Sequence, residues 1–258
     1  MAIQLSERDY LIFRLIKEHH VLLEKQIAWF ISLDEKPVLI RDRLRKLFYL
    51  DYLLCERHTG KLPWWTTPTK PLAYMLSPMT RQMLNASDTA YALSDGETQR
   101  HLLEVANLRM LLLQDQKEGL IANCTWESSR KAQFDEAGYD AIVSFKQNEI
   151  SHHIGIINNP PGGVSGALRA VNQALEEKAI HNVWIISADD SFQRSLQQGL
   201  ASTAIAGRVA FATHQEIYKT GAIKANWQST NGQALAAIGS VTDNQLTWPG
   251  HLTAAPAV

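Results

Sequence analysis

The sequence feature that most constrains this chain is a short basic segment at residues 36–50, KPVLIRDRLRKLFYL. Its apolar side chains recur at helical spacing and form one stripe: Ile40, Leu44, Leu47 and Phe48. Pro37 suits a first helical turn, where its missing N–H is not needed. The basic side chains fall mostly outside that stripe: Arg41, Arg43, Arg45 and Lys46. We therefore predict an amphipathic helix with a basic outer face, which serves either as a solvated surface or as a helix that contacts phosphates and base edges.

The segments that precede this helix favour the second interpretation. Ser6 can cap a first helix that ends near His20, because its hydroxyl can accept a hydrogen bond from an amide of the first turn. A second short helix is expected at about 24–32, followed by a turn at 33–36. Three short helices of which the third is basic form the helix-turn-helix arrangement.

The segments that follow the basic helix predict a β-hairpin. Residues 51–57 can form a strand, residues 58–61 a tight turn, and residues 62–66 a returning strand. A hairpin in this position is typical of the wing of a winged helix. It would carry His58 and Lys61 near its tip, where basic side chains reach a phosphate or the minor groove.

A further helix, begun by Ser77 and Pro78, completes the first predicted domain, a winged helix-turn-helix at residues 1–85. Its expected DNA contacts are Arg41, Arg43, Arg45, Lys46, His58 and Lys61. Trp64 and Trp65 either anchor the wing, contact a partner or stack on a base. This domain holds 13 Lys and Arg against 9 Asp and Glu, whereas the rest of the chain holds 12 against 17. The asymmetry indicates a nucleic-acid-facing module attached to another domain.

After a polar linker at 86–96, the hydrophobic pattern indicates a second domain at 97–225 and a weakly structured tail at 226–258 with at most an edge strand at 236–241. Helices are expected at 97–118, 165–178 and 191–200. Strands are expected at 120–127, 139–145, 150–157, 182–187 and 208–213, with a hairpin turn around 147–148. This order predicts an α/β (α+β) fold with a mixed sheet flanked by helices.

The same order is found in the restriction-endonuclease-like fold, whose motif is written PD-(D/E)xK. Its chemistry needs an Asp and a second carboxylate to hold Mg²⁺ against the scissile phosphate, and a lysine that helps to activate water. Asp140 can supply the first carboxylate, with Glu104 and Glu127 as further candidates. The strand that should carry the acid-x-Lys element ends instead in Asn158 and Asn159. We therefore expect a degenerate site without a cofactor, or Mg²⁺ or Mn²⁺ at Asp140 if the site is active.

The cysteine content and the hydropathy of the chain argue against a membrane-spanning, secreted, disulfide-linked or zinc-binding protein. No apolar run reaches the ~18 residues of a membrane span, and the N-terminus lacks a basic-then-apolar signal segment. The two cysteines, Cys55 and Cys124, are far apart and outside any metal-ligand spacing. We expect neither a disulfide framework nor a structural zinc site, and a reducing cytoplasm fits this usage best.

The combined motifs resemble those of bacterial replication-relaxation proteins, including MobC-type plasmid mobilisation proteins. The motifs are LSERD at 5–9, RLRKLFYL at 43–50, YMLSP at 74–78, HLLEVANLR at 101–109 and YDAIV at 139–143. The resemblance implies a winged helix joined to a restriction-endonuclease-like domain, with Asp140 as the family's strand Asp. It also implies binding at an origin of transfer, or a related site of a plasmid or integrative element, as a nicking relaxase or as an accessory factor.

The leading hypothesis is sequence-specific binding of double-stranded DNA at such a site, in a relaxosome or regulatory role. The second domain would then be an inactive nuclease-like scaffold for dimerisation, further DNA contact or docking of mobilisation proteins. One alternative is a metal-dependent nicking endonuclease that uses Glu104, Glu127 and Asp140. Another is a winged-helix transcriptional regulator whose second domain senses a ligand. No membrane partner is expected.

Overall fold

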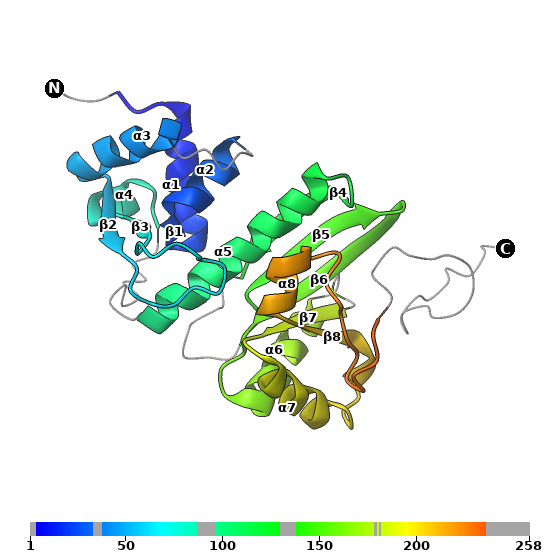
Figure 1. Cartoon of the computed structure of the whole chain (residues 1–258). Helices are drawn as coiled ribbons and strands as arrows, with labels where there is room; N and C mark the ends of the chain where they lie inside the picture. Colours follow the sequence, from blue (N-terminus) through cyan, green and yellow to red (C-terminus); the bar gives the residue numbers. More distant parts are fainter. Residues whose placement is uncertain are drawn as a thin grey trace. The chain divides into compact units, whose positions relative to one another are not determined.

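The computed structural model describes residues 4–32, 38–86, 96–129, 138–177, 180 and 182–235. Over these residues the chain is a mixed α/β protein with a three-stranded antiparallel sheet and a five-stranded mixed sheet (Figure 1). It divides into two compact units, residues 1–114 and 115–258. The α/β (α+β) class expected from the sequence is confirmed. Of the helices described, none is both long enough and apolar enough to cross a membrane.

The first unit combines short helices with a small sheet. Its described elements are α1 (Glu7–His19), β1 (Leu22–Leu23), α2 (Glu24–Ser32), α3 (Val38–Tyr49), β2 (Leu53–Arg57), β3 (Leu72–Leu76), α4 (Pro78–Met83) and most of α5 (Gly96–Lys117). The strands lie in the order β1-β3-β2, so that Tyr74 of the central strand is opposite both Leu22 and Cys55. The expected cap of α4 is confirmed, because the Ser77 hydroxyl accepts a hydrogen bond from the amide of Thr80.

One apolar core joins these helices to the sheet. Three side chains of α3 are fully buried in it: Ile40, Leu44 and Leu47. The apolar stripe predicted for the basic helix is therefore confirmed in its main part. Phe48 is the exception, since 40% of its surface is exposed. The expected turn at 33–36 and Pro37 lie outside the described residues.

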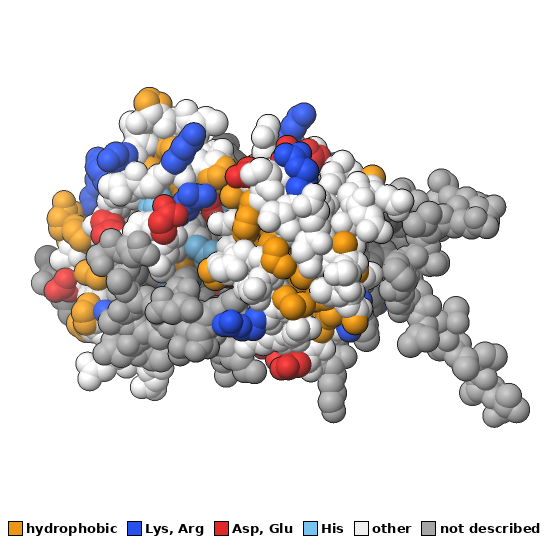
Figure 2. Space-filling model, turned by 90° about the horizontal axis from the view of Figure 1, so that it is seen from below, with side chains coloured by type: hydrophobic (Ala, Val, Ile, Leu, Met, Phe, Trp, Pro, Cys, Tyr) orange, Lys and Arg blue, Asp and Glu red, His pale blue; other side chains and the backbone are white. Residues whose placement is uncertain are grey.

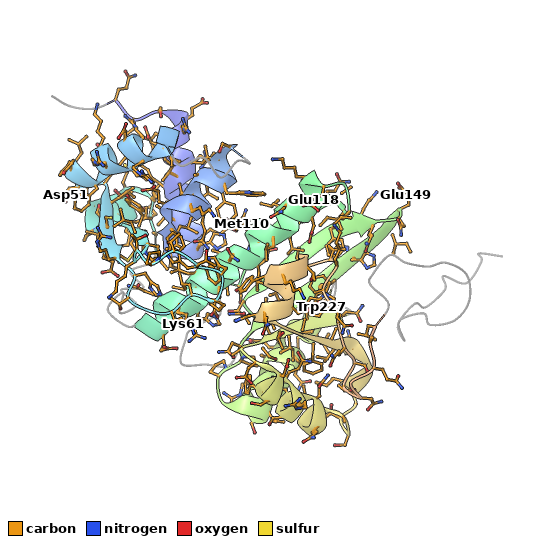
Figure 3. All side chains as sticks on the ribbon, in the orientation of Figure 1. Asp51, Lys61, Met110, Glu118, Glu149 and Trp227 are labelled. Carbon is orange, nitrogen blue, oxygen red and sulfur yellow. The ribbon has the colours of Figure 1, made fainter. Side chains whose placement is uncertain are left out.

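The predicted returning strand of the wing is wrong. Residues 62–66 form a turn rather than a strand, and β2 pairs instead with β3 at 72–76. Pro63 has no N–H to give to a ladder. Trp65 closes the turn, because its amide donates to the carbonyl of Leu62 at 3.1 Å. The connection between the two strands is thus a long loop, and Lys61 lies in it (Figure 3).

Helix α5 contains the division between the two units, which falls between residues 114 and 115. In the first unit, Ala106 belongs to the apolar core, and the Gln26 amide donates to the carbonyl of Leu103 at 2.9 Å. In the second unit, the Asp115 carboxylate accepts a hydrogen bond from the amide of Ile223 at 2.9 Å. The division therefore differs from the boundary expected at the 86–96 linker, most of which lies outside the described residues.

The second unit is built on the five-stranded sheet. Its elements after α5 are β4 (Ala122–Ser128), β5 (Ala141–Gln147), β6 (Ile150–Asn158), α6 (Gly163–Glu176), β7 (Asn182–Ser187), α7 (Asp190–Leu200), β8 (Val209–Thr213) and α8 (His214–Thr220). The strands lie in sequence order, with β4, β5 and β6 antiparallel and β6, β7 and β8 parallel. The predicted succession of helix, three strands, helix, strand, helix and strand is confirmed.

Local sequence explains how this sheet turns and packs. The β5–β6 hairpin predicted around 147–148 is present, with Asn148 and Glu149 both at positive φ, as tight two-residue turns require. Helices α6 and α7 cover one face of the sheet (Figure 1). Val171 and Leu196 of these helices share a buried cluster with Phe211 of β8.

The described start of the expected C-terminal tail belongs to the core of the second unit. Trp227 is 3% exposed and stacks on Trp184 of β7, with ring centroids 4.3 Å apart (Figure 3). The next residue, Gln228, exchanges two backbone hydrogen bonds with Phe211. Trp227 and Gln228, which we expected in the tail, thus pack on β7 and β8, and a single buried tryptophan gives no hydrophobic period that the sequence could show. The edge strand expected at 236–241 lies outside the described residues.

Replacing Trp227 by alanine should destabilise the second unit by about 3–5 kcal/mol, since the substitution removes a buried aromatic side chain and leaves a cavity. Urea unfolding followed by circular dichroism measures the change. Ile150→Ala is the control, because Ile150 is 42% exposed and should change the free energy of unfolding by only about 0.5 kcal/mol. Equal stability of the Trp227→Ala variant and the original chain would contradict the assigned anchor.

Candidate functional site

The outer face of α3 carries three of the four cations that we predicted to contact DNA from this helix. Arg41 and Arg45 lie one helical turn apart, with 50% and 59% of their side chains exposed. Lys46 is exposed as well. Arg41 is paired with Glu24 at 2.8 Å, and Arg45 lies 3.7 Å from the carboxylate of Asp42. These three cations are thus available at the surface, as the helical spacing predicted.

Arg43 has a different environment from the other three. Its guanidinium donates hydrogen bonds to both carboxylate oxygens of Asp9, with Nε 2.7 Å from Oδ1. The Asp9 carboxylate also accepts hydrogen bonds from the amide and hydroxyl of Ser6 at 2.7 Å, which completes the cap of α1. The Asp9 side chain is fully buried, and that of Arg43 is 25% exposed. Arg43, which the sequence analysis placed among the DNA contacts, thus fastens α3 to the first turn of α1.

The pKa of Asp9 reflects this arrangement. Burial alone would raise it, but the hydrogen bonds from Arg43 and Ser6 and the positive charge of Arg43 outweigh burial. The pKa of Asp9 therefore lies below its ordinary value, and that of Arg43 is raised by the same hydrogen bond. A carboxylate ionised inside the protein needs such a partner, because removing the partner leaves a buried charge uncompensated.

Replacing Arg43 by alanine should lower the free energy of unfolding by about 3 kcal/mol at neutral pH. Because the folded-state pKa of Asp9 is depressed, its stabilising contribution is present above its unfolded pKa of about 4 and is lost as the pH falls through the folded value. The difference between the two proteins should therefore shrink in acid. Denaturation at several pH values measures it. Arg45→Ala, which changes an exposed side chain, is the control. A difference that grows in acid would contradict this assignment.

His58 is also corrected. The predicted exposed position at the wing tip is a buried one, with 1% of the residue exposed. Its Nδ1 lies 3.1 Å from the side-chain oxygen of Gln99 on α5. Gly60 packs directly over the ring, since a Cβ atom at that position would come within 2.7 Å of Nε2. The partner lies 41 residues away in the sequence, so local pattern could not reveal that His58 packs inside. Lys61 is exposed, as predicted.

A basic cavity of about 290 Å³ lies beside α3 in the first unit. Among the residues that line it are Glu24 and Lys25 of α2, Arg41 of α3, Arg57 at the end of β2, and Trp65 and Lys70 of the β2–β3 connection. Four cationic side chains and one carboxylate give these six residues a net charge of +3. Figure 2 shows several Lys and Arg side chains close together on the surface of the first unit, at the left of the view.

Hydrogen bonds hold the walls of this basic cavity in place. The Trp65 indole N–H donates to the carbonyl of Thr69 at 2.7 Å, and Arg57 Nη1 donates to the carbonyl of Lys70 at 3.3 Å. Trp65 thus anchors the β2–β3 connection. Of the four cations, only Arg41 was predicted from the sequence as a DNA contact. Arg57 and Lys70 are 13 residues apart, and only the pairing of β2 with β3 brings them together.

The three carboxylates proposed for nuclease chemistry are in separate environments. Glu104 belongs to the first unit, where it is buried and ion-paired with Arg100 at 2.9 Å. Glu127 is exposed on β4, opposite Ile142. Asp140 directly precedes β5, and its carboxylate accepts a hydrogen bond from the backbone amide of Asn158 at 2.7 Å. Across the described parts of the chain, no three His, Cys, Asp or Glu residues are grouped so that they could hold a metal ion.

The end of β6, where the motif requires a carboxylate, carries an amide that bonds to a histidine. Asn158 is fully buried, and its side-chain oxygen lies 2.6 Å from Nε2 of His214 at the start of α8. An amide that bonds to a buried histidine cannot supply the negative charge that a divalent cation needs. The amide was predicted from the sequence, but His214 was not, because α8 was not among the expected helices.

The chain matches none of the protein-family models against which it was scanned, and a search of curated proteins finds no match. Membership of the replication-relaxation family therefore stays a prediction that depends on the sequence motifs.

Proposed function

We propose that this protein binds double-stranded DNA sequence-specifically through its first unit, as a winged helix-turn-helix. The order α1, β1, α2, α3, β2, β3 and the sheet order β1-β3-β2 support the proposal, since a winged helix has this order. The observation that carries it is the exposed cationic face of α3 beside the basic cavity. Helix α3 would lie in the major groove, where Arg side chains can bond to base edges and Lys to phosphates.

The proposed context is the origin of transfer of a plasmid or integrative element. The sequence motifs at 43–50, 74–78 and 139–143 support this part of the proposal. The protein would act there in a relaxosome, together with other mobilisation proteins, or as a regulator. Binding as a homodimer would place two copies of α3 on neighbouring half-sites.

We further propose that the second unit is a restriction-endonuclease-like domain without nuclease activity. The mixed five-stranded sheet with Asp140 before β5 supports the fold. The buried Asn158–His214 pair supports the loss of activity, because the position of the second metal-binding carboxylate is neutral. Such a unit can serve as a scaffold for partners. A metal-dependent nicking enzyme built on Asp140 is the rival, and it differs in its need for Mg²⁺ or Mn²⁺.

Replacing both Arg45 and Lys46 by alanine should weaken binding to duplex DNA and make its salt dependence shallower by about one unit of log K against log salt, because the phosphate contact of Lys46 is lost together with the base contact of Arg45. Anisotropy of a labelled random-sequence duplex over a salt series measures this change. Arg169→Ala with Arg194→Ala, on exposed positions of α6 and α7, removes the same charge as a control. Unchanged binding by the α3 variant would overturn the role of α3.

Incubating the protein with supercoiled plasmid and Mg²⁺ or Mn²⁺ tests the role of the second unit. We expect no nicked circles on an agarose gel above the level without protein. Nicking that Asp140→Ala abolishes would establish the rival function, provided that Glu176→Ala, at an exposed carboxylate of α6, leaves it unchanged. The plasmid should carry the element from which the chain comes, so that its own binding site is present.

A further inference from the structure

We propose that the basic cavity beside α3 is a binding site for a phosphate group, and that Glu24 is an internal competitor for that phosphate. The inference rests on the proposed DNA binding for the source of the phosphate, a DNA backbone. It goes beyond that proposal because it assigns a second contact surface, formed by Lys25, Arg57 and Lys70, that is separate from the outer face of α3.

The charge of the cavity indicates that its ligand is an anion. Lys25, Arg41, Arg57 and Lys70 converge on one concave surface, and all four are exposed to solvent. Like charges that line one cavity repel one another, so their placement around it raises the free energy of the unliganded protein. A bound phosphate relieves that repulsion and accepts hydrogen bonds from guanidinium and ammonium groups. The site therefore favours an anion with several acceptor oxygens.

The position of the cavity indicates that the anion is part of a DNA strand bound by α3. Its residues come from the start of α2, from Arg41 on the exposed face of α3, from the end of β2 and from the loop before β3. Arg41 lies one turn from Arg45, so one edge of the cavity continues directly into the exposed face of α3. A DNA strand whose groove receives α3 would pass its phosphates beside this edge. Trp65 holds the loop that bears Lys70, because its indole is bonded to Thr69.

Glu24 competes with the phosphate for Arg41. Its carboxylate lies 2.8 Å from Nε of Arg41 and is largely shielded, with 12% of its side chain exposed. It is the one acidic residue among those that line the cavity. Without a ligand, Glu24 occupies Arg41. With a phosphate bound, Arg41 exchanges one anion for another, so Glu24 weakens binding.

Three proteins test the proposal in the DNA anisotropy measurement over a salt series. Lys25→Ala with Lys70→Ala should weaken duplex binding and make the salt dependence shallower by about two units. Glu24→Gln should tighten binding by about two- to fivefold, the factor that matches release of one ion pair at the protein surface whose arginine is half exposed. The matched control is Glu118→Gln, which removes a carboxylate paired with Lys224 in the second unit and should leave binding unchanged. Thermal melts followed by circular dichroism should show all of these variants folded.

The outcomes separate this inference from the proposed function. If the original protein does not bind duplex DNA, the proposed function fails. If it binds, and the Arg45/Lys46 variant is weakened while the Lys25/Lys70 variant is not, the cavity inference is overturned and the proposed function stands. Unchanged affinity of Glu24→Gln would overturn the role of Glu24.

A calorimetric titration with a deoxynucleoside monophosphate and with inorganic phosphate distinguishes the source of the phosphate. The expected result is weak or absent binding of both, because a single free phosphate lacks the contacts that α3 adds. Tight binding of either that depends on Lys25 and Lys70, together with duplex binding that does not, would overturn a DNA backbone as the ligand.

Discussion

The arrangement of the first unit depends on one buried interaction, the ion pair between Asp9 and Arg43. The carboxylate is fully buried, caps α1 through Ser6, and receives the guanidinium of α3 across 34 residues of sequence. Apolar packing of α1 against α3 is not directional and permits small rotations of either helix. A carboxylate held by two hydrogen bonds from one guanidinium fixes the rotation of α3. It therefore decides which cations of α3 face solvent.

Hydrophobic periodicity was enough to predict most elements of both units, because it reports which side chains are buried. It predicted α3 with Leu44 inside and the order of helices and strands in the second unit. It failed where a residue's environment depends on a distant partner. The sequence around Arg43 predicted a surface cation, but Arg43 is bonded to Asp9, 34 residues away. The sequence around His58 predicted an exposed turn residue, but His58 is buried beside Gln99, 41 residues away. The burial of Trp227 could not be predicted from hydrophobic periodicity, because one buried side chain forms no repeating pattern.

The two units differ in the charged and polar side chains at their candidate sites. The first leaves cations exposed on α3 and around the basic cavity, and its acids at Glu24 and Asp9 are used to hold arginines. The second buries a neutral amide and a histidine where nuclease chemistry would need a carboxylate, at Asn158 and His214. This contrast is the physical basis for proposing DNA binding in the first unit and a scaffold, rather than catalysis, in the second.

The most direct test of the central claim is to map the DNA-binding surface of the whole chain by amide chemical shifts. A labelled sample titrated with a short duplex should show its largest shifts on α3 around Arg45, and next around the cavity at Lys25 and Lys70. Amides of α6 and α7 should stay unchanged. Shifts confined to the second unit, or no shifts at DNA concentrations that saturate binding, would contradict the account.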